Sequence, residues 1–324
     1  MSSAGRRFIV IGGAGFIGSH VVAKLLRDNA AAVTVYDNFS SGRKWHLQDG
    51  SMAPRLRTVR GEVVDIRALA HAMNGHDTVI HLASNPDIAK AVKDPEIDFY
   101  QGTMLTQQVL EAMRHCGVQR LWYASGSGVY GERGEVAVAE DDGPFFPIST
   151  YGASKLAGEA LIASYCAMFG MTANAFRFGN VVGARQTHGV GLDFLRRLRL
   201  DPGRLRILGD GSQSKPYVHV SDAVSAMLLA DAKSEGGFAV FNVATADALR
   251  VDEIATMALQ RLMLDGKAEL DYTGGDRGWK GDVPVVRLRT DRIRALGWEP
   301  ILSSREAMSR AMTEMLADER TFWN

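Results

Sequence analysis

The sequence has little cysteine and no excess of charge. Only two of its 324 residues are cysteines, Cys116 and Cys166, which is too few for a disulfide framework, and they form no C-x-x-C pair. Lys plus Arg and Asp plus Glu both number 37, so the chain lacks the global positive field of a nucleic-acid binder. The sequence contains no run of about 18 apolar residues, which argues against a membrane span. We therefore expect a cytoplasmic globular protein that binds neither nucleic acid nor membrane.

Short apolar runs alternate with longer stretches of helical spacing through the first half of the chain. Hydrophobic residues make up 46% of the sequence, enough for a large core. Short continuous apolar runs indicate buried parallel strands. The alternation predicts an α/β fold, a doubly wound parallel (Rossmann) sheet. The expected strands are Phe8–Ile11, Ala32–Tyr36, Thr78–Leu82 and Arg120–Ala124, and the expected helices are Gly15–Asp28, Ile66–Met73, Ile97–His115 and Thr150–Phe169.

The alternating pattern loosens after Arg177. We expect a nucleotide-binding domain over residues 1–178 and a smaller α/β substrate lobe over residues 179–324, which returns one or two elements to the first sheet. The elements expected in this part are Asp193–Arg199, Leu205–Leu208, Ser221–Ala230, Phe241–Ala244, Val251–Leu264 and Ser303–Glu314.

The first expected strand runs into a glycine-rich turn with the sequence GGAGFIG. Glycine permits positive φ and lets backbone N–H groups approach a pyrophosphate. The helix that opens there presents free donors and a partial positive charge to an anion. A strand before the turn, a helix after it and an acid about 20 residues later predict a dinucleotide site. A glycine turn that holds no ligand is the alternative. The predicted contacts are Gly12, Gly15, Phe16, Ile17 and Gly18.

The acid in question is Asp37, at the end of the second strand. A carboxylate there accepts from both ribose hydroxyls and repels a 2′-phosphate, so it favours NAD over NADP. Arg43 is the feature that favours NADP, but it comes six residues late. Asp65 is expected to accept from the adenine amine, and small residues after the third run leave room for the cofactor; a surface acid and simple packing are the alternatives. The predicted contacts here are Asp37, Asn38, Asp65, Ile66, Leu82, Ala83 and Ser84.

Tyr151 and Lys155 open a long amphipathic helix, and their i, i+4 spacing places them on one face. A phenol has a reference pKa of about 10 and is a poor base at neutral pH. A nearby ammonium and a nicotinamide cation both favour the phenolate, so we expect a pKa near the operating pH. We also expect Lys155 to donate to the nicotinamide ribose. Y-x-x-x-K is commonly structural, but its place after a dinucleotide turn favours catalysis.

With these motifs the sequence resembles the extended short-chain dehydrogenase/reductases, specifically the nucleotide-sugar epimerases and dehydratases. The resemblance covers nearly the whole chain, and the UDP-galactose 4-epimerase-like branch is the most similar. It rests on Gly12–His20, Tyr36–Asn38, Val79–Ser84, Val129–Gly131, Tyr151–Lys155, Arg177–Gly183, Gly209–Asp222, Gly281–Pro284 and Leu296–Trp298.

The resemblance implies that NAD stays bound and that Tyr151 takes the proton of the sugar 4-hydroxyl. The implied reaction is epimerisation of a nucleoside-diphosphate hexose at C4 through a transient 4-keto sugar. Asn180 matches a residue that contacts the substrate phosphates. Lys215 falls where the family often has a phosphate-binding arginine, and lysine lacks the two-pronged geometry of that residue. Arg277 is a further phosphate candidate, but the R-x-G-D spacing of the family is not reproduced, so a surface arginine is the alternative.

The chain departs from the family at two positions. Gly126 replaces the catalytic Ser or Thr. Its neighbours Ser125 and Ser127 are candidates for the hydroxyl that contacts the sugar oxygen. We favour Ser127, because glycines on both sides leave its backbone free to aim it; a serine with a loop role, or a tyrosine acting alone, are the alternatives. Gly102 replaces an asparagine that supports the tyrosine helix, so Gln101 or solvent is expected to substitute.

Several other functions remain open. Dehydratases of the family carry an Asp-Glu pair where this chain has Ser127 and Gly128, so dehydration is not expected. A reductase or a decarboxylase of a nucleotide sugar is an alternative. A non-catalytic NAD-sensing or scaffold protein is a third, favoured by Gly126 and opposed by the intact Tyr-Lys pair. The nucleobase, the sugar and the inverted carbon are not specified by the sequence.

Two further expectations concern metals and partners. His81, His188 and His219 lack metal-ligand spacing, so no metal is expected. The helices expected over Ile97–Cys116 and Leu156–Phe169 are apolar enough to pair between two subunits, and members of the family generally dimerise that way. We therefore expect a homodimer.

Overall fold

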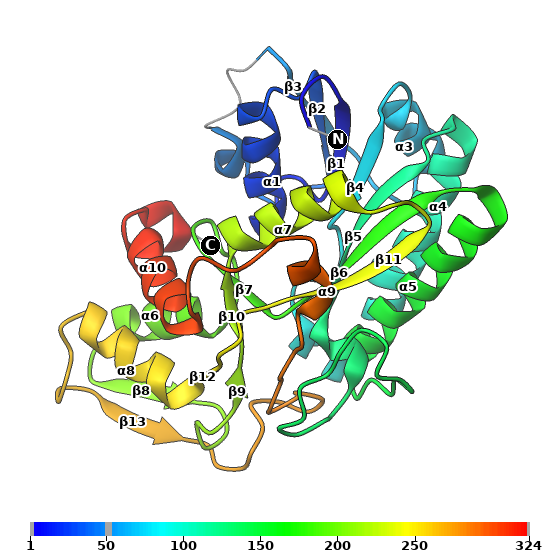
Figure 1. Ribbon diagram of the computed structural model, residues 1–324. Coiled ribbons are helices and arrows are strands. Elements are labelled where there is room, and N and C mark those ends of the chain that lie inside the picture. Colours follow the sequence, from blue (N-terminus) through cyan, green and yellow to red (C-terminus); the bar gives the residue numbers. More distant parts are fainter. Residues whose placement is uncertain (1–2, 49–53, 323–324) are drawn as a thin grey trace.

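A seven-stranded sheet forms the centre of the computed structural model, which describes residues 3–48 and 54–322 (Figure 1). The strand order is β11-β6-β5-β4-β1-β2-β3, and every neighbouring pair is parallel. The predicted doubly wound α/β fold is therefore confirmed. The order reverses beside β1, and ligands of such sheets bind at this point, outside the carboxyl ends of the strands. The strands are β1 (Arg7–Ile11), β2 (Ala32–Asp37), β3 (Leu56–Arg60), β4 (Thr78–His81), β5 (Arg120–Gly126), β6 (Thr172–Phe178) and β11 (Phe238–Val243).

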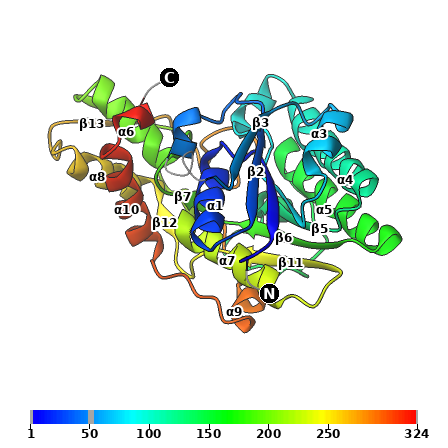
Figure 2. The ribbon, with the colours of Figure 1, turned by 90° about the horizontal axis from the view of Figure 1, so that it is seen from above.

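Helices cover both faces of this sheet (Figure 2). Along β1, Phe8 and Val10 face one apolar cluster, while Ile9 and Ile11 face another on the opposite side. All four side chains are fully buried, which is why the strand is a continuous apolar run. The first cluster packs under α1 (Phe16–Arg27) and α7 (Val220–Lys233), and the second packs under α3 (Ile66–Met73), α4 (Leu105–Cys116) and α5 (Thr150–Phe169).

The helix expected over Ile97–His115 begins differently from the prediction. A π-helical turn, η3 (Phe99–Met104), precedes α4. Gly102 in this turn is buried, and a Cβ there would lie 2.0 Å from the Ser154 hydroxyl oxygen. The wide π-helical turn and the missing side chain at Gly102 thus allow α5 to pack closely against η3. Gln101, expected to substitute for the family asparagine, is exposed, and Ser154 lies against the position where that side chain would begin.

A second apolar core lies beyond the sheet, between α6 (Val190–Leu200), α8 (Val251–Arg261) and α10 (Ser304–Leu316). The chain does not stay in this lobe, because α7 and β11 return to the central sheet and α9 (Asp291–Ala295) lies against β11. The boundary at residue 178 stays a prediction. The small strands pair as β7 (Asn180–Val182) with β10 (Tyr217–His219), β8 (Arg204–Ile207) with β13 (Glu269–Tyr272), and β9 (Ser214–Lys215) with β12 (Leu249–Arg250).

Short helical turns connect the larger elements. Across residues 3–48 and 54–322, no helix combines the length and the apolar character needed to cross a bilayer. The turns are η1 (Lys44–Leu47), η2 (Ile88–Val92), η4 (Ser127–Tyr130) and η5 (Glu319–Phe322).

Candidate active site

The glycine turn between β1 and α1 packs directly on the end of β4. Gly12 has φ +79°, and a Cβ there would lie 2.8 Å from the backbone nitrogen of Ala83. A Cβ on Gly18, in the first turn of α1, would lie 2.3 Å from the carbonyl oxygen of Gly12. Gly15 precedes the helix without a side-chain cap, and the first turn contains no acid. The N-terminus of α1 is therefore electropositive and open to an anion, as a pyrophosphate requires. The predicted contacts Phe16 and Ile17 are its first two residues.

Asp37 connects the end of β2 to this turn. One of its carboxylate oxygens accepts from the Ala14 N–H at 2.9 Å, and the other accepts from the Phe39 N–H at 2.8 Å. Burial raises the pKa of the Asp37 carboxyl, while these two N–H groups act against that rise. Each oxygen has a further lone pair with which it can accept from a ribose hydroxyl. The turn, the helix N-terminus and this carboxylate together fit a dinucleotide with a free 2′-hydroxyl.

Asp65 has a structural role that sequence reasoning overlooked. It is exposed, and its Oδ1 accepts from the Ala68 N–H at 3.0 Å, which caps α3. An Asp directly before an apolar helical run is the signal of such a cap. Glu62, which sequence reasoning did not single out, accepts from the Asn38 amide at 3.0 Å, beside Asp37. Glu62 lies two residues after β3, a strand that is not among those expected from the sequence, so no sequence signal singled it out. Contact of Asp65 and Ile66 with adenine stays a prediction.

The end of β4 supplies small and uncharged groups. Leu82, Ala83 and Ser84 follow the strand and are half-buried. His81 is its last residue, with Nε2 3.2 Å from the Thr106 hydroxyl oxygen. Burial lowers the pKa of His81 to about 3, so the ring is neutral. In the described parts of the chain, no three His, Cys, Asp or Glu side chains gather as a metal ion would require.

Tyr151 and Lys155 lie on the first two turns of α5 and share one face of it. The helix begins after Ser149, whose hydroxyl accepts from the Gly152 N–H at 3.1 Å. Lys155 is buried, with its ammonium donating to the Ala124 carbonyl at 2.8 Å, and its Nζ lies 5.5 Å from the centre of the Tyr151 ring. The end of β5 therefore anchors the lysine, while the tyrosine ring stays half-buried at the carboxyl edge of the sheet.

The pKa values of this pair are shifted in opposite directions. Burial raises the pKa of Tyr151 to about 12, and the Asp98 carboxylate acts in the same direction. Burial lowers the pKa of Lys155 to about 8, against the charges of Asp98 and Glu159. The expected pKa near the operating pH includes the charge of the nicotinamide, so it stays a prediction, while burial and Asp98 raise the pKa of the phenol when the protein's own groups act alone. Tyr151 needs a further positive charge beside it before it can act as a base at neutral pH.

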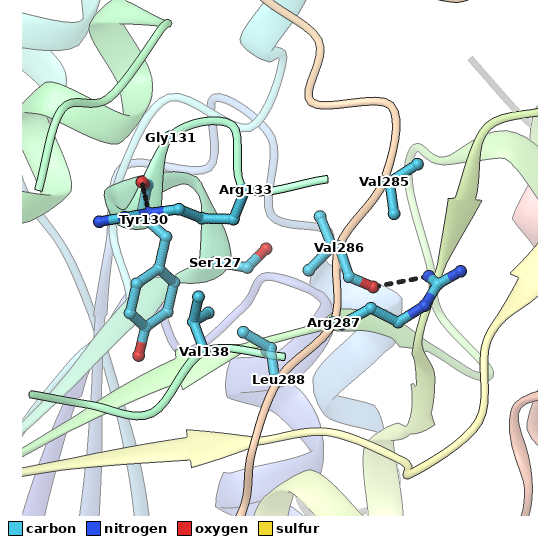
Figure 3. A pocket seen from close by; sticks show the side chains of 9 residues that line it. All are labelled: Ser127, Tyr130, Gly131, Arg133, Val138, Val285, Val286, Arg287 and Leu288. Atoms are coloured by element: carbon cyan, nitrogen blue, oxygen red, sulfur yellow. Dashed lines mark hydrogen bonds between the residues drawn. The ribbon is translucent and has the colours of Figure 1, made fainter. Parts of the chain in front are cut away.

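Gly126 is the residue of β5 that faces Tyr151. A Cβ at this position would lie 4.0 Å from Cε1 of the ring, an ordinary contact. The Ser125 hydroxyl donates to Oε1 of Glu159 at 2.5 Å and is buried. Ser127 begins η4 and lines a small crevice under residues 285–288, with its hydroxyl directed toward Val286 (Figure 3). Ser125 thus has its proton engaged in the interior, and the contact of Ser127 with the sugar stays a prediction.

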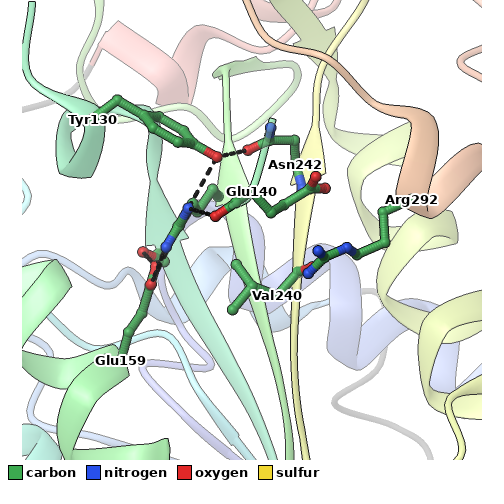
Figure 4. A network of polar contacts seen from close by, with 8 residues as sticks. Tyr130, Glu140, Glu159, Val240, Asn242 and Arg292 are labelled. Carbon is green, nitrogen blue, oxygen red and sulfur yellow. Dashed lines mark hydrogen bonds and ion pairs between the residues drawn. The ribbon is translucent and has the colours of Figure 1, made fainter. Parts of the chain in front are cut away.

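A buried ion pair joins the elements around this edge of the sheet (Figure 4). Arg177 on β6 donates to Glu159 on α5, with Nη2 and Oε2 2.6 Å apart. The same guanidinium donates to the Tyr130 hydroxyl at 3.0 Å, and that hydroxyl donates to Asn242 on β11 at 2.6 Å. Because the Glu159 carboxylate also accepts from Ser125, the network ties α5, β6 and β11 to the end of β5, which contains Gly126. Such a fully paired network fixes one arrangement of its parts.

The predicted phosphate-binding residues lie on the lobe side, and both cations among them are already paired. Lys215 on β9 contacts Asp282, with Nζ and Oδ1 2.6 Å apart. Arg277 pairs with Glu132 at 2.8 Å and donates to the Asp282 carbonyl at 2.9 Å. Asn180 begins β7 and is half-buried. The structure thus brings Lys215 and Arg277 together at Asp282, with carboxylate partners that the sequence did not predict.

The fold and this edge of the sheet define a class of protein: a dinucleotide-dependent enzyme with a Tyr-Lys pair beside a glycine turn. The family model described as "NAD dependent epimerase/dehydratase family" matches residues 8–244, and the chain belongs to this family. Its cofactor is NAD.

Relatives match the chain over nearly its full length. A putative UDP-glucose 4-epimerase of Methanocaldococcus jannaschii is 30% identical and covers 97% of this chain and 99% of its own. The crystal structure of Thermotoga maritima UDP-glucose 4-epimerase with UDP-glucose has a TM-score of 0.86, 30% identity, and coverage of 96% and 99%. That of a Streptomyces venezuelae dTDP-glucose 4,6-dehydratase with NAD has a TM-score of 0.88, 27% identity, and coverage of 97% and 98%.

Proposed function

We propose that the protein epimerises a nucleoside-diphosphate hexose at C4, with UDP-glucose and UDP-galactose as its substrate pair. The observation that carries the proposal is the half-buried Tyr151 beside an anchored Lys155, at the sheet edge where the glycine turn receives a dinucleotide. The relatives that support the choice of sugar are named UDP-glucose 4-epimerases and match nearly the full chain. The NAD that the glycine turn, Asp37 and Lys155 would hold would supply reversible hydride transfer at C4 and, in its oxidised form, a positive charge beside Tyr151.

The chain's own part in this reaction is to hold and move one proton. Tyr151 takes it from the 4-hydroxyl and later returns it to the 4-oxygen. With its pKa held at about 12 by burial and Asp98, the phenol is protonated until positive charge gathers beside it. Lys155 contributes part of that charge, and its ammonium also binds the nicotinamide ribose. Its bond to the Ala124 carbonyl fixes the lysine to β5, so that the reacting groups keep one orientation.

The substrate diphosphate binds on the lobe side, to Asn180, Lys215 and Arg277. Asp282 and Glu132 hold the two cations in place. Ser127 donates to the sugar oxygen, since Gly126 has no hydroxyl and the Ser125 proton is given to Glu159. The same turn argues against the dehydratase reaction of one structural neighbour, because Ser127 and Gly128 provide no carboxylate pair.

The test is turnover of defined substrates by the purified protein without added cofactor. We expect proton NMR to show interconversion of UDP-glucose and UDP-galactose. A panel of GDP-, CDP- and dTDP-hexoses tests the choice of nucleobase. Tyr151→Phe is expected to retain NAD and to lower turnover by about 10²–10⁴-fold. Tyr100→Phe, at an exposed position, should leave turnover unchanged. Full activity of Tyr151→Phe would contradict the proposal. Bound NAD with no conversion of any sugar would favour an NAD-sensing scaffold.

We also infer a cytoplasmic homodimer. Four large apolar side chains are exposed on η3 and at the end of α5, where helices of two subunits would pair. The two cysteines are free thiols, as in a reducing compartment. Light scattering of the purified protein tests the dimer, and a monomer would contradict it. The four side chains are Phe99, Tyr100, Met168 and Phe169.

A further inference from the structure

A buried carboxylate lies beside the proposed base without an ionic partner. Asp98, directly before η3, is 2% exposed. Its two oxygens accept from neutral donors, the Thr150 hydroxyl at 2.7 Å and the Asn85 amide at 2.9 Å. Within residues 3–48 and 54–322 it forms no ion pair with a basic side chain. Burying an unpaired carboxylate is costly, and such groups gather where a site uses their charge.

The two donors connect the segments that flank the site. Thr150 is the first residue of α5 and directly precedes Tyr151. Asn85 follows the predicted cofactor contact Ser84, and its side chain also holds the backbone of Asp87, at 3.0 Å in both directions. Asp98 therefore fastens the loop after β4 to the first turn of the helix that carries the base. A shift of this turn would move the Tyr151 ring relative to β5.

The charge of Asp98 acts on both members of the catalytic pair. It disfavours the Tyr151 phenolate and favours the Lys155 ammonium. Glu159 acts instead on the lysine and on the more deeply buried Tyr123. The titratable groups that face the pair from the packed elements are His81 from β4, Tyr123 from β5, Glu159 from α5 and Asp98.

We propose that Asp98 is a positioning residue of this site, which fixes the first turn of α5 through Thr150 and offsets the positive charge beside Tyr151. The inference rests on the proposed role of Tyr151 as the base. A base that takes a proton in every turnover must be basic enough to hold it until it is returned. The negative charge of Asp98 keeps the Tyr151 phenolate basic enough to take the proton of the 4-hydroxyl, while the contact to Thr150 keeps its ring in place.

An ultraviolet titration of the full-length protein isolates the Tyr151 phenol. The tyrosinate signal of Tyr151→Phe is subtracted from that of the wild type. The same subtraction is then made between the double variant, Asp98→Asn with Tyr151→Phe, and Asp98→Asn alone. Removing the carboxylate removes a charge that disfavours the phenolate, so the Tyr151 midpoint should fall by about one pH unit. Asp94→Asn, exposed on the same segment, should leave it unchanged.

Kinetics separate the charge from the contact. Asp98→Asn should move the pH profile of kcat toward lower pH, because both the Tyr151 and the Lys155 midpoints fall. Thr150→Val removes the donor but keeps the charge, so kcat should fall severalfold with no shift of the profile. Thr150→Ser keeps the hydroxyl and should restore kcat.

Each outcome decides one part of the inference. An unchanged Tyr151 midpoint in folded Asp98→Asn would overturn the role of the charge. If that variant does not fold, the Thr150 pair decides: wild-type kcat in Thr150→Val would overturn the positioning role. If Tyr151→Phe keeps full activity, the proposed function fails instead, and the titration still reports whether Asp98 acts on the phenol.

Discussion

The cofactor side of the site (the glycine turn) and its proposed substrate side (Lys215 and Arg277) are held together by different interactions. On the cofactor side, backbone lies against backbone, with Gly12 and Gly18 placed where no side chain fits. On the substrate side, Lys215 and Arg277 meet carboxylates that come from distant parts of the chain. Close backbone packing admits no small adjustment, whereas a half-buried ion pair can exchange one partner for another. Substitutions in the glycine turn should therefore be poorly tolerated, whereas substitutions of the paired cations should weaken binding by degrees.

Gly18→Ala should have the largest effect, because it breaks the cofactor side at its tightest contact. The new Cβ would lie 2.3 Å from the Gly12 carbonyl oxygen, so the turn must shift. We expect NAD to be lost on gel filtration and the free energy of unfolding to fall by about 1–3 kcal/mol in urea. Gly203→Ala is the control, because a Cβ there meets nothing closer than 3.4 Å. Full retention of NAD by Gly18→Ala would show that the turn is not the dinucleotide site.

Lys215→Met should have the next largest effect and should leave the cofactor side untouched. Loss of a hydrogen bond from a charged group costs about 1.5–3 kcal/mol, so we expect KM for the nucleotide sugar to rise about 10–100-fold. NAD content and kcat should stay near wild type. Arg277→Met should raise KM less, because that side chain is more exposed, 34% against 21%. The opposite ranking would move the main phosphate contact to Arg277.

The two serines beside Gly126 should separate stability from catalysis. Ser125→Ala removes a donor to buried Glu159 and should lower the free energy of unfolding by about 1 kcal/mol, with little change in kcat. Ser127→Ala should lower kcat about tenfold without a change in the unfolding curve. Urea unfolding and steady-state rates of both variants provide the measurements. A loss of kcat confined to Ser125→Ala would reverse our assignment.

A smaller effect concerns acid stability of the lobe. Burial raises the pKa of Glu314, but His219 and Arg310 outweigh it and lower the pKa from 4.5 to about 2. A lowered folded-state pKa contributes stability that is present above pH 4.5 and is lost as the pH falls toward about 2. Glu314→Gln should therefore flatten the fall of the unfolding free energy over this interval. An acid transition as steep as that of the wild type would locate its cause elsewhere.

The cofactor side was more readable from the sequence than the substrate side, because its signals are local. The glycine turn, Asp37 at the end of a strand, and the Tyr151-Lys155 spacing can each be recognised from a few neighbouring residues. The contact of Asp98 with Thr150 joins positions 52 apart, and that of Arg277 with Glu132 joins positions 145 apart. Only the folded sheet brings such partners together. The same holds for the pKa of Tyr151, which depends on burial and on a carboxylate from another element.

The path of the chain after residue 178 has a consequence for taking the protein apart. β11 forms the edge of the central sheet next to β6, and α7 closes one of its faces. A protein truncated after residue 178 would lack β11 and α7. It would leave β6 as an unpaired edge strand and uncover apolar surface, so it should aggregate instead of folding as an isolated domain. Several crossings of the polypeptide, in place of one flexible tether, join the lobe to the sheet. Large hinge motions of the lobe relative to the sheet are therefore not expected.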